Sequence, residues 1–282
     1  MANLEPPGTR GKGRIGAHVK RRFLEPNPRH LRDRLITFGL VFVVLGFWEL
    51  FARLGKISTV IFPAPTLIIK ALFVDLAAGL YTKHVLISIS RMLLGMLFGG
   101  TSGLILGLIM GWSRTVRRIL DPIVATLHPI PKMTLLPMAL IIFGLGETSR
   151  VVMVSISAFF PMLVNTMVGV RQINPTYYEV VENYGSSRLD IFRKVVFPGS
   201  LPYVLSGFRL SFKSALTTTI GIEMVFGNSG LGSFLWLAWE TMRMWNLYAG
   251  IIIIAIIGAG TTWLIEFLKK YLLPWHHENR TS

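Results

Sequence analysis

Apolar residues are gathered into six long runs, separated by shorter polar and charged segments. A helix needs about 20 consecutive apolar residues to cross the hydrocarbon core of a bilayer. The runs cover residues 36–54, 85–112, 119–145, 149–170, 202–226 and 247–270. The pattern predicts an all-α polytopic membrane protein with six transmembrane helices. The third run is the most irregular, because Pro122, Pro129, Pro131 and Pro137 interrupt its backbone hydrogen bonds.

Composition supports a membrane protein. Of the 282 residues, 52% are hydrophobic and 15% are charged, and the mean hydropathy is +0.56. This apolar content exceeds what a soluble core of this length needs. The net charge of +15 would suggest nucleic-acid binding in a soluble protein. Here the positive charge lies in a tail and in loops between apolar runs, so it indicates orientation in a lipid bilayer and no nucleic-acid partner.

The distribution of lysine and arginine predicts the topology. Basic residues cluster before the first run, after the second, between the fourth and fifth, and after the sixth. Because basic loops stay in the cytoplasm, both termini are expected there. Residues 1–34 are predicted to form a disordered basic cytoplasmic tail, residues 35–273 the transmembrane domain, and residues 274–282 a cytoplasmic C-terminal tail. A cleaved signal peptide is the alternative for the first run, but no small-residue cleavage site follows it.

The two longest connections on the other side of the membrane carry distinct patterns. Residues 55–84 contain FPAP at 62–65 and an amphipathic run over 66–80, which predicts a helix along the outer surface. The 227–246 connection, interpreted as a loop, holds Trp236, Trp239 and Trp245, as expected for rings at a membrane interface. Glycines recur through the second run at positions 95, 99, 100, 103, 107 and 111, and predict a face for close helix packing.

Residues 179–198, EVVENYGSSRLDIFRKVVFP, form a charged and partly amphipathic stretch between two apolar runs. Asn174 and Pro175 predict a helix start, and Gly185 predicts a left-handed C-terminal cap. Ser187 with Asp190 forms a capping box for a second helix, which Pro198 is expected to end. Two short helices over 175–198 that expose apolar residues are too short to be stable alone. They predict a docking element.

The spacing of this stretch resembles the EAA loop of importer-type ABC transporter permeases. Gly185 follows Glu179 by six residues, and Val195-Val196-Phe197-Pro198 follows after a nine-residue gap; Val180 and Val181 stand where the family has alanines. Four further segments resemble the nitrate, sulfonate, taurine and bicarbonate branch of that family. They are DPIVATLHPIPKMTLLPMALIIFGLGE (121–147), AFFPMLVNTMVGVR (158–171), LPYVLSGFRLSF (201–212) and EMVFGNSGLG (223–232). The resemblance covers residues 35–272.

The resemblance implies a non-catalytic permease subunit of the bacterial inner membrane. In the family, separate ATPase subunits bind ATP and Mg²⁺ and dock on the loop, an extracytoplasmic protein delivers the solute, and two permease copies commonly form the pathway. The residues implied in docking are Glu179, Val180, Val181, Gly185, Val195, Phe197 and Pro198. The solute implied is a small anion, with an aliphatic sulfonate or taurine first and nitrate or bicarbonate next. Neutral heterocyclic compounds are a further alternative for the transported solute.

Polar residues within the runs are the candidates for a translocation pathway, since ionisable groups at membrane depth are costly. The deepest ionisable ones are Arg91, Lys132, Arg209, Lys213 and Glu223. We select a set on the third, fourth and fifth runs as possible pathway residues: His128, Lys132, Asn165, Thr217, Thr218 and Glu223. Hydrogen bonding between neighbouring helices is the alternative role for each of them.

Catalytic and metal-binding motifs are absent from the sequence. It contains no G-x-x-x-x-G-K-[ST], HExxH or GxSxG, no cysteine, and no histidines at metal-ligand spacing. We therefore expect no enzymatic activity and no cofactor in this chain. One rival interpretation is an ATP-independent secondary transporter or channel, for which Glu223 is the sole candidate ion-carrying carboxylate. Another is a regulatory or structural protein whose basic tail binds anionic lipid.

Overall fold

The computed structural model describes residues 28–226 and 228–273, and these residues form helices and connecting turns. The chain divides into two compact units, residues 1–65 and 66–282. The predicted tail over 1–34 lies mostly, and the tail over 274–282 wholly, outside the described residues. Within the described part of the first unit, α2 (Pro28–Arg53) begins inside the predicted tail. Its segment Leu35–Arg53 is long and apolar enough to span a membrane, as predicted.

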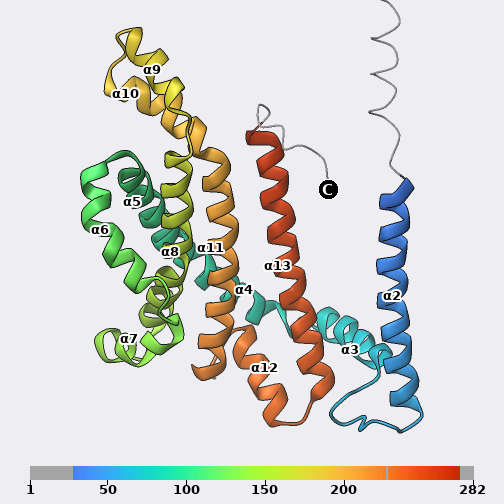
Figure 1. Cartoon of the computed structure of the whole chain (residues 1–282). Helices are drawn as coiled ribbons and strands as arrows, with labels where there is room; N and C mark the ends of the chain where they lie inside the picture. Colours follow the sequence, from blue (N-terminus) through green and yellow to red (C-terminus); the bar gives the residue numbers. More distant parts are fainter. Residues whose placement is uncertain (1–27, 227, 274–282) are drawn as a thin grey trace, which may run out of the picture. The chain divides into compact units, whose positions relative to one another are not determined.

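The second unit contains the remaining helices (Figure 1). In chain order they are α3 (Pro65–Ala77), α4 (Thr82–Gly95), the π-helix η1 (Met96–Gly100), α5 (Thr101–Trp112), α6 (Arg114–Leu127), the 3-10 helix η2 (Lys132–Leu135), α7 (Leu136–Phe143), α8 (Glu147–Arg171), α9 (Pro175–Asn183), α10 (Arg188–Ile191), the π-helix η3 (Phe192–Val196), α11 (Phe197–Phe226), α12 (Leu231–Glu240) and α13 (Met244–Leu272). Helix α3 covers most of the predicted 66–80 run and begins one residue before it.

Helix α8 packs between α5 on one side and α11 on the other. The predicted glycine face of the second apolar run makes the first contact. A Cβ atom added to Gly99 would overlap the carbonyl of Ser155, and one added to Gly103 would lie 2.5 Å from the carbonyl of Phe159. Absent side chains thus let the two backbones meet, as in other small-residue helix contacts. The prediction is confirmed at these positions, whereas Gly100 meets only the end of Met96.

Helices α8 and α11 run antiparallel, and hydroxyl groups join them along their length. Ser211 donates to the carbonyl of Ala158 at 2.7 Å, and the hydroxyl oxygen of Ser157 lies 2.6 Å from those of Ser214 and Thr218. These polar groups satisfy one another between the helices. The pair therefore places α9 and α10 at one end of this unit, and α7 and α12 at the opposite end (Figure 1). We call these the α9 end and the α12 end.

The predicted count of six spans is not confirmed by length and composition. Four described helical segments meet that test, namely Leu35–Arg53, Thr82–Trp112, Glu147–Arg171 and Met244–Leu272. A fifth is possible if α6 and the η2–α7 segment form one broken span, which bends by 91° at residues 128–131. Pro129 and Pro131 lie in this break, which is where the sequence predicted irregularity. Helix α11 has 30 residues but does not meet the test, because Arg209, Lys213 and Glu223, together with its serines and threonines, lower its hydropathy.

The predicted loop over 227–246 is wrong, because half of it forms helix α12 and α13 begins at Met244. Leu231, Phe234, Leu235 and Ala238 share one buried face, with exposed fractions between 0% and 8%. Their i, i+3, i+4, i+7 spacing is the signature of a helix that packs on a core. Trp236 and Trp239 lie on the exposed side of α12 with their rings 5.1 Å apart. Because Trp236 and Trp239 are apolar but point outward, the apolar positions of residues 231–240 do not show a clear helical period in the sequence.

Candidate functional site

Helix α9 has the ends that its sequence predicted. The side chain of Asn174 accepts a hydrogen bond from the backbone N–H of Thr176 at 3.0 Å, and Pro175 occupies the first turn. At the other end Gly185 has φ +70°, its N–H donates to Glu182 O, and Ser186 N–H donates to Val181 O. This pair of bonds is the Schellman motif, which requires a left-handed residue at the glycine position. Local capping chemistry therefore fixes the turn between α9 and α10.

The second helix starts as predicted but does not end at Pro198. Ser187 accepts from the Asp190 N–H at 3.2 Å and donates to its carboxylate at 2.5 Å. The Ser187 hydroxyl, together with Lys194, holds the pKa of Asp190 below its usual range. Beyond it the π-turn η3 lets the Phe197 N–H bond to Phe192 O, so the ladder shifts immediately before the proline. Consequently α10, η3 and α11 form one continuous helical path.

An apolar cluster anchors this element to the rest of the unit. Ile191 and Val196 are 7% and 1% exposed, and they pack with Val170 of α8. Leu108 of α5 and Val181 of α9 also contact the cluster. Burying such side chains contributes roughly 1.5–3 kcal/mol each. A displacement of residues 175–198 must therefore move α8 and α11 with it.

The opposite side of the element has no partner in the described structure. Val180, Tyr184 and Leu189 are exposed by 48%, 86% and 57%, although each is large and apolar. Glu179 is also exposed and lines a hollow of about 510 Å³ with Arg114, which lies at the start of α6. Of the other predicted docking residues, Phe197 is 42% exposed, Pro198 is half-buried, and Val195 is 9% exposed.

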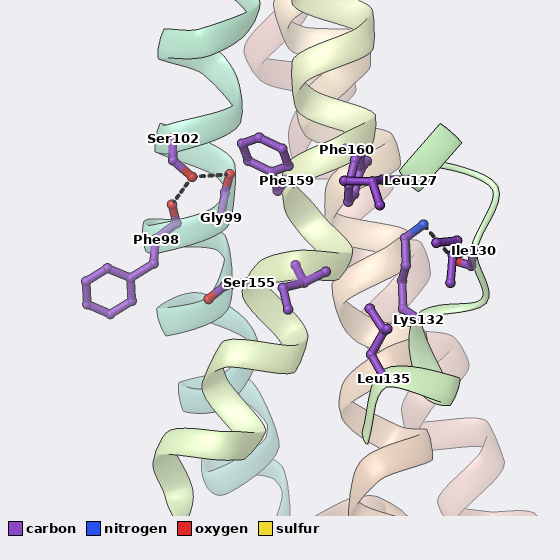
Figure 2. A pocket seen from close by; sticks show the side chains of 11 residues that line it. Phe98, Gly99, Ser102, Leu127, Ile130, Lys132, Leu135, Ser155, Phe159 and Phe160 are labelled. Atoms are coloured by element: carbon purple, nitrogen blue, oxygen red, sulfur yellow. Dashed lines mark hydrogen bonds between the residues drawn. The ribbon is translucent and has the colours of Figure 1, made fainter. Parts of the chain in front are cut away.

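The predicted pathway residues fall into two groups. His128 and Lys132 lie in the break between α6 and α7, and Lys132 lines a hollow of about 490 Å³ that is otherwise almost wholly apolar (Figure 2). Lys132 Nζ donates to the carbonyls of His128 and Ile130 and lies 4.7 Å from the centre of the Phe160 ring. These contacts cap the break, since Lys132 supplies donors for carbonyls that no helix satisfies. The pathway role of the pair stays a prediction.

The second group lies on α8 and α11. Asn165 donates to Pro161 O at 2.8 Å within its own helix. Thr218 is 7% exposed and bonds to Ser157, whereas Thr217 is exposed and donates to Lys213 O. Glu223 is 1% exposed and belongs to an ion-pair network. Burial favours a structural role for Thr218 and Glu223 in this conformation. Of the predicted pathway residues on α11, Thr217 is the exposed one.

Arg91 is the centre of that network, and no partner was predicted for it from the sequence. Its guanidinium makes two bonds to Glu147 at 2.5 and 2.7 Å and one to Glu223 at 2.8 Å. Two more bonds reach the carbonyl and hydroxyl of Ser229 at 2.9 and 2.7 Å. Arginine has five N–H groups, so this cation, only 2% exposed, is fully satisfied. The network joins α4, α8 and α11 at the α12 end of the unit.

The carboxylate of Glu223 also determines the backbone of the 228–232 turn. Its second oxygen accepts from the hydroxyl of Ser88 at 2.7 Å and from the N–H of Gly232 at 3.0 Å. Gly230 has φ +99° and comes so close to the carboxylate that an added Cβ would overlap it. The network thus explains why EMVFGNSGLG (223–232) combines a glutamate with closely spaced glycines. The sequence does hold a signal for a buried ion pair, because Arg91 and Glu223 are oppositely charged residues within apolar runs.

Residues 103–275 match the family described as "Binding-protein-dependent transport system inner membrane component". The chain belongs to that family. It is thus an importer-type ABC permease, as the resemblance implied, and membership covers α5 to α13, including the 175–198 element. The family description places such proteins in the inner membrane, in agreement with the apolar helices.

Individual relatives place the chain in the expected branch. It is 31% identical to the taurine transport system permease protein TauC of Escherichia coli, over 88% of this chain and 92% of TauC. It is 30% identical to the putative aliphatic sulfonates transport permease protein SsuC of Bacillus subtilis, over 83% and 85% of the two chains. The nitrate import permease protein NrtB of Leptolyngbya laminosa is 28% identical, over 86% and 89%.

A solved structure supports the fold. A chain from the inward-facing MetNI methionine ABC transporter superposes with a TM-score of 0.53, covering 74% of this chain and 98% of that one. The sequence identity is 17%, so this likeness bears on the fold alone. It confirms the all-α permease fold expected from the sequence.

Proposed function

We propose that this chain forms the translocation pathway of an ATP-driven importer for a small anion, and that residues 175–198 receive the ATPase subunits. An aliphatic sulfonate or taurine is the first solute class and nitrate or bicarbonate the next, by similarity to the relatives above. The observation that carries the docking proposal is an exposed apolar surface on an element anchored to two long helices. The α9 end is then cytoplasmic, with both termini on that side.

Coupling follows from the continuity of the α10–η3–α11 path. ATP-driven closure of two partner ATPases would displace residues 175–198, and the packed Ile191–Val196–Val170 cluster would carry α8 and α11 along. Rigid movement of packed helices is a common basis for switching between states. Two copies of the chain would enclose the pathway, α11 would be the sixth span, and a solute-binding protein would deliver solute at the α12 end. ATP and Mg²⁺ belong to the ATPases in this scheme.

Co-purification tests the docking proposal. The tagged chain, expressed with its native neighbours, is expected to retain a nucleotide-binding subunit, and Glu179→Arg is expected to reduce the retained amount at least about tenfold. The reason is that reversing one charge at the centre of a docked surface leaves it unpaired and desolvated, at a cost of several kcal/mol.

Lys70→Glu is the matched control, because it reverses one exposed charge on α3, outside residues 175–198. It should leave the ATPase bound. Equal retention in Glu179→Arg and in the control would show that residues 175–198 are not the dock. The secondary-transporter interpretation would then take its place.

A further inference from the structure

One cation on α11 has no counterion among the described residues. Lys213 is exposed, and its ammonium forms no ion pair or hydrogen bond with any residue in the described part of the chain. Its neighbour Arg209, one turn away, forms an ion pair with Glu266 of α13 at 2.9 Å. The same helix therefore holds one neutralised and one unneutralised basic group.

Lys213 lies near the middle of the span. The ends of α8 and α11 are level, because Arg91 bonds to both Glu147 and Glu223, and Gly169 meets Ser200. Lys213 lies ten residues before Glu223 and fourteen after Gly199, roughly 15 and 21 Å along a helix that rises 1.5 Å per residue. A lysine side chain covers only part of either distance, so its ammonium cannot reach the interface by snorkelling. Facing lipid there would cost about 3 kcal/mol or more.

The exposed stripe around Lys213 is bounded by two packed helices. Leu210, Lys213 and Thr217 share one face of α11 by their i, i+3, i+7 spacing, and all three are exposed. Ser211 and Ser214 turn toward α8, while Arg209 turns toward α13. The hydroxyl of Thr217 donates to the carbonyl of Lys213, so the ammonium is the strong donor of this stripe.

No carboxylate of the described chain is free at this depth, and a second copy would bring only the same set. Glu223 and Glu147 are engaged by Arg91, and Glu266 by Arg209. Asp121 lies seven residues into α6, roughly 10 Å from the α9 end, whereas Lys213 lies roughly 21 Å from that end. Within the described residues, no carboxylate is therefore available as the counterion of Lys213.

We infer that Lys213 lines the aqueous pathway and binds the negatively charged group of the transported solute. This inference rests on the proposed transport function and assigns Lys213 as the group that recognises the negative charge of the small anion, such as a sulfonate, carboxylate or inorganic oxyanion. A mobile solute is a suitable partner because the ammonium is a point charge on a flexible stem, which can bind and release an anion.

The test uses the absence of cysteine from this chain. Lys213→Cys, assembled with its ATPase and solute-binding protein in proteoliposomes, is assayed with labelled taurine, ethanesulfonate, nitrate and bicarbonate. Uptake of the transported probe is expected to fall at least about tenfold. Aminoethyl methanethiosulfonate then attaches an ammonium through a disulfide and releases methanesulfinate, and should restore at least about a third of the uptake. The sulfonatoethyl reagent attaches a negative charge and should not.

Controls separate the possible outcomes. Lys270→Cys, at the end of α13, should transport normally with either reagent, and the wild-type complex treated in the same way reveals effects on partner cysteines. Lys213→Arg should retain transport. Full uptake by Lys213→Cys, no rescue by the aminoethyl reagent, or a wild type that transports none of the four anions would each overturn the inference. Loss of ATP dependence in the wild type would instead contradict the proposed function.

Discussion

Arg91→Met is expected to lower the stability of the permease by about 3–5 kcal/mol, the usual effect of removing one partner from a buried ion pair. The substitution leaves Glu223, 1% exposed, without the cation that neutralises it, and it removes bonds to Glu147 and Ser229. The melting temperature of the purified complex should fall by roughly 10 °C, given about 2–4 °C per kcal/mol for a chain of this size.

Arg209→Met provides the matched control, because it breaks an ion pair of similar length between side chains that are 32% and 56% exposed. Exposed pairs contribute about 0–1 kcal/mol, so the control should melt within a few degrees of the wild type. The double variant Arg91→Met, Glu223→Met should recover part of the loss, since no buried charge is left unpaired. Equal melting temperatures for Arg91→Met and Arg209→Met would show that the network does not stabilise the α12 end.

Gly230→Ala is expected to have an effect of similar size through a different mechanism. The residue has φ +99°, which side chains disfavour, and its Cβ would overlap the Glu223 carboxylate. Strain and overlap should together destabilise the complex by about 3 kcal/mol, because overpacking alone costs 1–3 kcal/mol and a strained backbone 1–3 kcal/mol. The measurement is again the melting temperature of the purified complex.

Gly144→Ala separates these two contributions. Gly144 has φ +76°, but an added Cβ meets nothing within 4 Å. It should therefore show only the backbone cost, about 1–2 kcal/mol. If both variants melted alike, the close packing of Gly230 on Glu223 would not be the cause of its effect.

Local sequence signals predicted the 175–198 element well. Asn174, Gly185 and Ser187 act through bonds between residues two to five positions apart, and Pro175 acts through its fixed φ, so their patterns determine the helix ends directly. The glycine face of the second run was predictable for a similar reason, since small residues at helical spacing indicate a close neighbour.

Features that depend on residues far apart in the chain were not predicted. Arg91 and Glu223 are 132 positions apart, and nothing near either residue in the sequence identifies its partner. The π-turn at 192–196 was missed because Pro198 normally marks a helix end, and here the shifted ladder accommodates it. The hydroxyl contacts between α8 and α11 join residues 53 to 61 positions apart, so the sequence does not reveal them.

Together these features give the two ends of the second unit different roles. At the α12 end, the Arg91 network holds three helices and the 228–232 turn in a fixed arrangement. At the α9 end, an exposed apolar surface lies on a path continuous with α11. In the proposed mechanism, force enters at the exposed surface and the fixed end keeps α4, α8 and α11 together as they move.

Cross-linking in membranes tests the central claim most directly. A photoreactive group is attached to a single cysteine at Val180, which is 48% exposed, in a chain that has no other cysteine. Leu67 of α3, 55% exposed, is the control position. The account predicts that position 180 cross-links to a nucleotide-binding subunit, with a yield that ATP changes, and that position 67 does not. If position 180 gave no such product while the chain still transported solute, coupling through residues 175–198 would be contradicted.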